Sequence, residues 1–108
     1  MSLKRYAAKR DENEKDIIDA LQRMGAEVYR LSASGLPDLL VGWRGINILV
    51  EVKQNKGKHT PEQIRFQQTW TGQQCTIRTV DEAIELLQTI KKLWKQQNLE
   101  LAIGLLIQ

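Results

Sequence analysis

Two strand-like runs, separated by only two residues and the second of them rich in β-branched residues, place the strongest constraint on the fold of this chain. Residues 36–43 and 46–53 each have the length and composition of a strand. Between them stands Arg44-Gly45, a pair that suits a two-residue hairpin turn. The two runs are therefore predicted to form an antiparallel hairpin.

Helices and further strands are predicted on either side of this hairpin. Apolar residues at a spacing of three and four indicate a first helix that ends at Gly25. Thr60 and Pro61 are typical of a helix start, and Gln63 stands where a capping-box partner would. The elements expected around the hairpin are a helix over 11–24, a strand over 26–31, a helix from Thr60 to near Gly72, a strand over 75–80 and a long helix capped by Asp81. The predicted order is α-β-β-β-α-β-α, an α/β fold.

The bulk composition fits one globular domain. A chain of 108 residues is expected to form a single domain over 1–108, with a core over about 11–97. No stretch is long and apolar enough to cross a membrane, and the N-terminus has no secretory pattern, so we expect a cytoplasmic protein of a bacterium or a virus-infected host. A net charge of +3 mildly favours a polyanionic partner. Cys75 is the sole cysteine, which excludes an internal disulfide; it is expected to be buried and inert.

The last residues, 98–108, form a mostly apolar tail. Such a tail can cover a sheet edge as a strand, extend the last helix, or bury itself in a second subunit. We favour a contact between two copies in a homodimer.

The charged residues of the hairpin indicate chemistry. Because side chains alternate along a strand, Glu51 and Lys53 share the face opposite to Val50 and Val52. Asp38 and Glu51 are both six or seven residues from the turn, so the hairpin brings them together. Two carboxylates and an ammonium group are thus expected to converge.

Bunched carboxylates repel one another unless a cation lies between them, and hard oxygen ligands suit Mg²⁺ or Mn²⁺. Asp38 and Glu51 are the expected metal ligands, with the backbone carbonyl of Val52 as a further one. Such a metal can activate water and offset charge on a phosphate, and Lys53 can orient the water or stabilise the transition state.

A fourth acidic candidate is Glu14. It precedes Ile18 by four residues and Leu21 by seven, so it lies on the apolar stripe of the first helix. A carboxylate on an inward face needs a partner, which a metal site or a lysine would provide. The alternative is that Glu14 simply compensates the dipole at the start of the helix.

These motifs resemble those of a known family. G-L-P-D-L-L, I-L-V-E-V-K and T-P-E-Q-I-R-F-Q, preceded by E-K-D-I-I-D-A-L, resemble the virus-type replication-repair nuclease (VRR-NUC) domains of the PD-(D/E)XK superfamily. The resemblance implies a restriction-endonuclease-like fold, with a mixed sheet flanked by helices in the core order αβββαβ. It also implies an endonuclease of branched, Holliday-junction-like DNA that acts as a dimer. In this resemblance Asp38 and Glu51 correspond to metal ligands, Lys53 to the catalytic lysine, Glu14 to the acid of the first helix, and Gln63 to the glutamine that follows the motif.

Plainer interpretations remain open for single residues. Glu51 and Lys53 can form an ordinary surface ion pair, Gln63 can serve only as a helix cap, and His59 can be a solvated loop residue. Lys56, Lys58 and His59 are nonetheless candidate contacts to a DNA backbone. For the whole chain, the competing hypothesis is a non-catalytic DNA-binding or assembly module of the same fold. A restriction-like enzyme would need base-reading loops for which the chain has little room.

Overall fold

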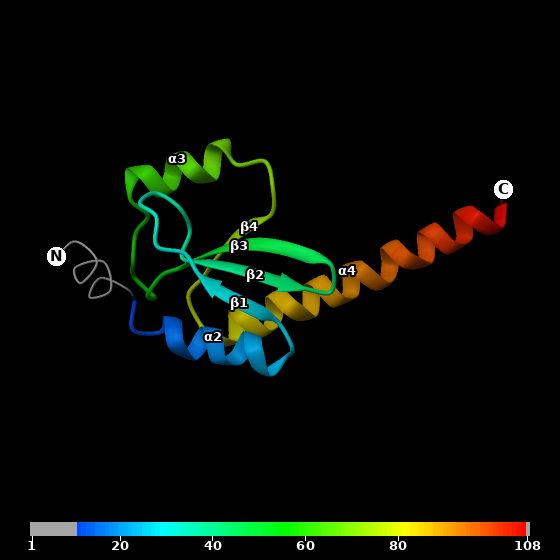
Figure 1. Ribbon diagram of the computed structural model, residues 1–108, viewed down its shortest axis with the longest axis horizontal. Coiled ribbons are helices and arrows are strands. Elements are labelled where there is room, and N and C mark those ends of the chain that lie inside the picture. Colours follow the sequence, from blue (N-terminus) through cyan, green and yellow to red (C-terminus); the bar gives the residue numbers. More distant parts are fainter. Residues whose placement is uncertain (1–10, 108) are drawn as a thin grey trace.

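The structure, a computed structural model, describes residues 11–107 as a four-stranded sheet with three helices (Figure 1). Its elements are α2 (Glu14–Arg23), β1 (Glu27–Arg30), β2 (Leu39–Trp43), β3 (Ile46–Val52), α3 (Pro61–Thr69), β4 (Gln74–Ile77) and α4 (Val80–Ile107). The strand order is β1-β2-β3-β4. The first three strands are antiparallel and β4 runs parallel to β3, so the sheet is mixed, as predicted.

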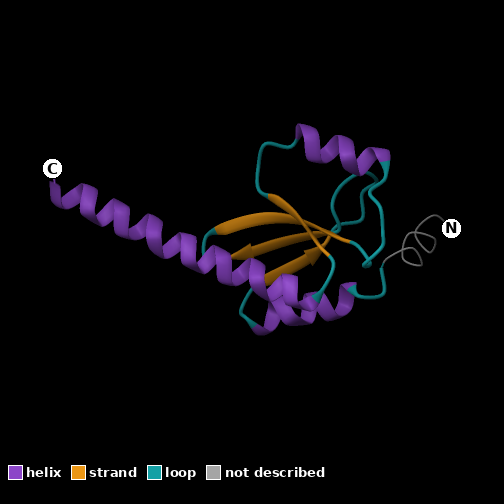
Figure 2. Ribbon diagram, turned by 180° about the vertical axis from the view of Figure 1, so that it is seen from behind, coloured by secondary structure: helices purple, strands orange, loops and turns teal. Residues whose placement is uncertain are grey.

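The helices cover the two faces of the sheet unequally. Helices α2 and α4 lie beneath the sheet, and α3 alone lies above it (Figures 1 and 2). The predicted order of elements is confirmed throughout the described part of the chain.

The turn between β2 and β3 has the geometry that its two residues suggest. Arg44 and Gly45 both have positive φ angles, of 51° and 81°, as a two-residue turn matching the twist of a hairpin requires. The register is Trp43↔Ile46 through to Leu39↔Val50. This register fixes which residues meet at the far end of the hairpin.

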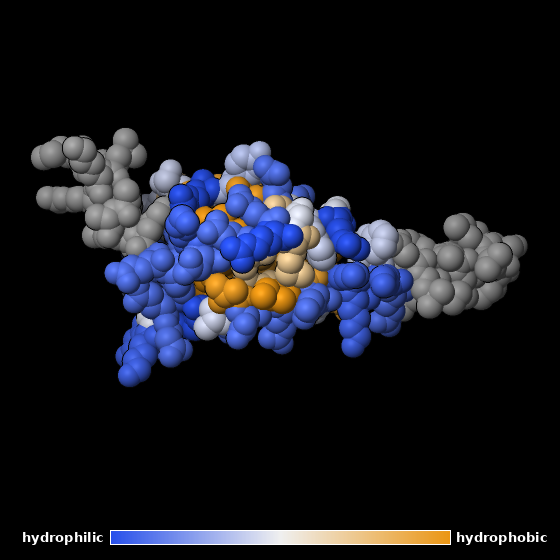
Figure 3. All heavy atoms as spheres, turned by 90° about the horizontal axis from the view of Figure 1, so that it is seen from below, coloured by the Kyte–Doolittle hydropathy of each residue, from blue (hydrophilic) through white to orange (hydrophobic). Residues whose placement is uncertain are grey.

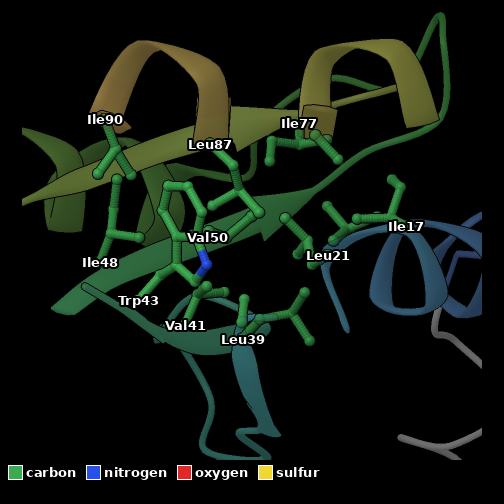
Figure 4. Close-up of a cluster of buried hydrophobic side chains, with 13 residues drawn as sticks. Ile17, Leu21, Leu39, Val41, Trp43, Ile48, Val50, Ile77, Leu87 and Ile90 are labelled. Carbon is green, nitrogen blue, oxygen red and sulfur yellow. The ribbon is translucent and has the colours of Figure 1, made fainter. Parts of the chain in front are cut away.

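The hydrophobic core lies between the sheet and the lower helices (Figure 4). Leu39, Val41 and Val50 from the hairpin are fully buried there. They pack with Ile17 and Leu21 of α2, and the α4 residues that join this cluster are Ala83, Leu87 and Ile90. Alternate residues of β2 and β3 are therefore committed to the core, and the residues between them face α3.

The start of α4 differs from the prediction. Asp81 was expected as the cap, but the helix begins at Val80 and is capped by Thr79. The Thr79 hydroxyl accepts from the Glu82 N–H at 3.1 Å, and the Glu82 carboxylate accepts from the Thr79 N–H at 3.2 Å. This is a Thr-x-x-Glu capping box. The strand predicted over 75–80 ends at Ile77, which leaves Thr79 free to cap the helix.

Helix α4 continues through Ile107. Of the three possibilities for the tail, its backbone therefore extends the last helix. The helix leaves the core after Ile90, and Leu93 and Trp94 are already exposed. The molecule measures 60 × 30 × 24 Å, elongated along this helix. Side-chain contacts of the tail, and residues 1–10, lie outside the described residues.

The lower surface, over α2 and the first part of α4, is mostly hydrophilic with an apolar patch near its centre (Figure 3). Within residues 11–107, no helix is both long and apolar enough to span a bilayer.

Candidate active site

Asp38 and Glu51 meet at the open end of the hairpin. Leu39 pairs with Val50, so one step further along the register Asp38 comes opposite Glu51. Asp38 Oδ2 accepts a hydrogen bond from the Val52 N–H at 2.8 Å, which ties the carboxylate to β3. Its backbone carbonyl accepts from the Leu31 N–H at 2.7 Å, which fixes the loop before β2 as well.

The two functional side chains of β3 face away from the core. Val50 and Val52 are buried in the core cluster, and Glu51 points to the α3 side of the sheet, as the alternation predicts. Glu51 is only 5% exposed although it carries an ionisable group. A buried carboxyl requires specific partners, and those of Glu51 are Gln63 and Asp38.

Gln63, at the start of α3, is one of these partners. Its Nε2 donates to Glu51 Oε1. Its Oε1 accepts from the Thr60 N–H at 2.8 Å, and the Thr60 hydroxyl accepts from the Gln63 N–H at 3.2 Å, which completes a capping box. From the sequence, Gln63 could be either a helix cap or a site residue; in the structure its one amide group caps α3 and also contacts Glu51. The cap directs the amide NH₂ toward Glu51.

The environment of Glu51 disfavours its charged form. Burial, the largest cause, and the charge of Asp38 raise the pKa of Glu51, and Lys53 lowers it; with every contribution included, the pKa is about 8. A side-chain hydrogen bond with Asp38 and the charge of Asp11 add to the upward shift. If Asp38 and Glu51 were both ionised, the site would have more negative charge than Lys53 alone can compensate, so a proton on Glu51 is favoured near neutral pH.

This excess of negative charge fits a divalent cation. Asp38 and Glu51 would hold it, since carboxylates are preferred Mg²⁺ and Mn²⁺ ligands. Across the described residues, no three His, Cys, Asp or Glu side chains are grouped so as to enclose a metal on their own. That is compatible with Mg²⁺, which is commonly bound by one or two carboxylates and completes its shell with water and substrate phosphates. The carbonyl of Val52 remains a predicted further ligand.

Glu14 lies on the inward face of α2, as predicted, and is 2% exposed. Its Oε1 accepts from Arg30 Nε at 3.0 Å, so an arginine of β1 is a partner of this carboxylate. Arg30 pairs with Leu39 in the sheet and thus lies on the core face, whereas Glu51 faces α3. A role of Glu14 as a metal ligand stays a prediction.

Asp11 is an acidic neighbour that the sequence did not single out. Burial raises its pKa, Lys53 and Arg78 lower it, and Asp38 raises it, which brings Asp11 electrostatically into the site. The segment is fixed by Asn13, whose Nδ2 donates to the carbonyls of Lys53 at 3.1 Å and Arg78 at 2.8 Å. In the sequence, Asp11 lies in a polar stretch that indicated only the start of a helix.

Arg78 organises the loop that follows Lys53. Its Nη1 donates to the carbonyls of Gln54 and Gly57, both at 2.8 Å, and reaches that of Asn55 at 3.4 Å. One guanidinium group therefore holds the turn after the candidate catalytic lysine. No local pattern in the sequence indicated this contact, because the partners are more than twenty residues apart.

The three candidate DNA contacts have different surroundings. Lys56 and Lys58 are exposed on the loop. His59 is partly buried, with its Nδ1 3.2 Å from Gln67 Nε2 and its Nε2 3.5 Å from Thr76 Oγ1. Burial, together with Lys53 and Arg78, lowers the pKa of His59, so a neutral ring is favoured. Cys75 was expected to be buried, but it is only partly buried. Burial raises the pKa of this thiol to about 11, which favours the unreactive protonated form.

Comparison with known proteins supports this architecture. No family model matches the sequence, and no curated protein matches it either. Among solved structures, a chain described as a "VRR_NUC domain" is similar, with a TM-score of 0.59 and 24% identity. The chain has a VRR-NUC-like fold. The match covers 97% of that structure and 72% of this chain, so nearly the whole fold of that structure is found within this chain. This confirms the restriction-endonuclease-like fold expected from the motifs.

Proposed function

We propose that this chain is a divalent-metal-dependent endonuclease that hydrolyses phosphodiester bonds in structured or branched DNA. The observation that carries the proposal is the convergence of Asp38 and Glu51 across the hairpin, with Glu51 buried and its pKa raised to about 8. Such strongly perturbed carboxyl groups are characteristic of functional sites. The VRR-NUC-like fold agrees with nuclease chemistry.

Each residue would have a distinct role. Asp38 and Glu51 would hold Mg²⁺ or Mn²⁺, aided by the Val52 carbonyl. Glu14 is a predicted additional acid of the site. When bound, this cation would supply an activated water and offset negative charge on the phosphate. Gln63 keeps the Glu51 carboxylate in a fixed orientation through its hydrogen bond. Lys53 would stabilise the negative charge that develops on the phosphate.

The surroundings of the site suit a nucleic acid. The exposed Lys56 and Lys58 follow Lys53 on the same loop and would contact the phosphate backbone, with the neutral His59 ring beside them. Such contacts position the substrate without reading its sequence. A homodimer would present two sites to the two strands of a branched substrate. We place this activity in the cytoplasm of a bacterium or a virus-infected cell.

The test is cleavage of labelled four-way junction, flap and linear duplex DNA in Mg²⁺, in Mn²⁺ and in EDTA. We expect cleavage that requires metal and is faster on the branched substrates. Asp38→Asn and Lys53→Ala should each lower the rate at least about a hundredfold, because each removes charge from the reacting centre. Asp19→Asn and Lys15→Ala are matched controls, since these two residues form an exposed pair on α2.

Metal-independent cleavage, or full activity of either site variant, would overturn the mechanism. Binding of junction DNA without cleavage in every metal would instead identify a non-catalytic DNA-binding module. A thermal melt gives a second readout: Mg²⁺ should raise the melting temperature of the wild-type protein and leave Asp38→Asn unchanged, because only a protein that binds the cation is stabilised by it.

A further inference from the structure

A pocket beneath α3 opens beside Glu51, and apart from Glu51 and Gln63 its lining residues have no role in the proposed chemistry. Its volume is about 190 Å³, and it lies between α3, the loop before β2, and strands β3 and β4. Glu51 and Gln63 form one wall, and Phe66, Gln67, Gln74 and Thr76 are among the residues that form the rest. Pockets for drug-sized ligands measure roughly 300–1,000 Å³, so this one would take a group of one or two rings.

The pocket is preformed because its polar side chains are already held. Gln74 Nε2 donates to the carbonyls of Gln67 at 3.0 Å and Trp70 at 3.3 Å. The Gln67 amide is 3.2 Å from the His59 ring. Phe66 stacks on Trp70 with ring centroids 5.4 Å apart, which fixes its ring. An incoming group would therefore meet ordered amides and an aromatic surface.

The lining selects against a phosphate and in favour of a neutral planar group. None of the described residues that line the pocket is a lysine or an arginine, and Glu51 places a carboxyl group at one end. Cys75, also in the lining, stays uncharged. Amide side chains bind the edges of nucleobases by hydrogen bonds, and aromatic rings stack on base faces.

We infer that this pocket receives one unpaired nucleobase of the substrate, next to the phosphate that is cleaved. The inference rests on the proposed function, because Glu51 would be shared by the metal site and the pocket. In a duplex, each base is stacked and paired inside the helix, so only a base turned out of the stack can enter. Turning out a base costs least where it is already unpaired. The pocket thus gives a physical reason for preferring flaps and branch points.

The test compares flap and junction DNA in which each unpaired nucleotide near the branch is replaced in turn by an abasic residue. Binding is measured in Ca²⁺ and cleavage in Mg²⁺. At one position the abasic substitution should weaken binding about tenfold, the effect of losing one stacked base. Gln67→Trp fills the pocket and should abolish the difference between the normal and abasic substrates. Gln68→Trp, on the exposed side of α3, should preserve it.

Thr76→Leu fills the pocket from β4 and should act like Gln67→Trp, which guards against a folding defect in either variant. Equal binding of all abasic substrates by the wild-type protein, or undiminished discrimination by both pocket variants, would overturn the inference. Metal-dependent cleavage without base discrimination would support the nuclease proposal and refute the proposed role of the pocket. Base discrimination without metal-dependent cleavage would support base binding in the pocket and refute the nuclease proposal.

Discussion

At the scale of single residues, Glu51 is the group on which stability and the proposed function conflict. Its burial and its proximity to Asp38 disfavour a negative charge on this carboxyl group, although Gln63 donates a hydrogen bond to it. In the absence of metal the proton is the available counter-charge. A bound cation would replace this proton as the counter-charge, so metal binding should release a proton.

Glu51→Gln should stabilise the metal-free protein at high pH. The folded pKa of about 8 lies above the ordinary 4.5, so the stability that Glu51 contributes is complete below about pH 4.5 and is lost as pH rises through 8. A glutamine stays neutral throughout. In EDTA at pH 9 we expect the variant to exceed the wild-type protein by about 1–3 kcal/mol in unfolding free energy, the cost of a poorly compensated buried group.

Urea unfolding at pH 5, 7 and 9 measures this difference. Glu62→Gln, an exposed change on α3, is the matched control and should follow the wild-type pH dependence. If Glu51→Gln and wild type lose stability in parallel between pH 5 and 9, the raised pKa is wrong.

Strand alternation alone predicted most of the residue-level geometry, including the pairing of Asp38 with Glu51. It depends on a two-residue turn and a period of two, both of which are local signals. Arg30, Asp11 and Arg78 were not predicted as partners, because their contacts depend on how separate elements pack. Glu14 illustrates both cases. Its inward position could be predicted from helical spacing, but its contact with Arg30 depends on the register of β1 with β2, which the sequence does not indicate.

At the scale of elements, the start of α3 links helix stability to the orientation of a site residue. Gln63 contacts Glu51 with one end of its amide and closes the capping box with the other. Thr60→Ala removes the hydroxyl that anchors this box. It should cost about 1 kcal/mol of stability, and it should slow cleavage several-fold although Thr60 itself does not contact Glu51 in the hydrogen bonds observed.

Thr60→Ser keeps the hydroxyl and serves as the control, with near wild-type stability and rate. Rates are compared at a temperature where all three proteins are fully folded, so that lost activity reports on the orientation of Gln63. A Thr60→Ala variant that is less stable but cleaves normally would limit the capping box to a structural role.

The loop after β3 depends on β4 through Arg78. Arg78→Met removes the hydrogen bonds to the Gln54 and Gly57 carbonyls while keeping much of the side-chain length. We expect the loop to open locally and trypsin to cut after Lys56 and Lys58 several-fold faster than in wild type, because local opening exposes the backbone to the protease. Arg78→Lys, which retains one charged donor, should fall between the two.

Mass spectrometry of the fragments from a limited digest separates cuts in this loop from cuts elsewhere. Unchanged cleavage after Lys56 and Lys58 in Arg78→Met would show that the guanidinium does not restrain the loop.

At the scale of the whole molecule, α4 extends beyond the compact domain. Its first turns complete the core, and the helix then continues away from the sheet with Leu93 and Trp94 exposed (Figure 1). The core-facing turns were predictable from apolar spacing. The continuation of the helix was not, because a short apolar tail fits a strand, a helix or a subunit contact equally well.

The sequence of the tail, rich in leucine and isoleucine, leads us to predict that α4 mediates a homodimer. A chain truncated after Gln97 should be monomeric by light scattering, and the full chain should have twice the mass expected for one copy, because burial of apolar surface drives such association. Leu101→Lys combined with Leu105→Lys changes residues four apart in the sequence, hence on one face of a helix, and should dissociate the dimer at full length. Asn98→Lys with Glu100→Lys adds charge to the same helix without removing apolar residues and should leave the dimer intact. If the truncated and full chains have the same number of copies, the tail is not the interface, and the two-site arrangement for branched DNA must be built from another surface.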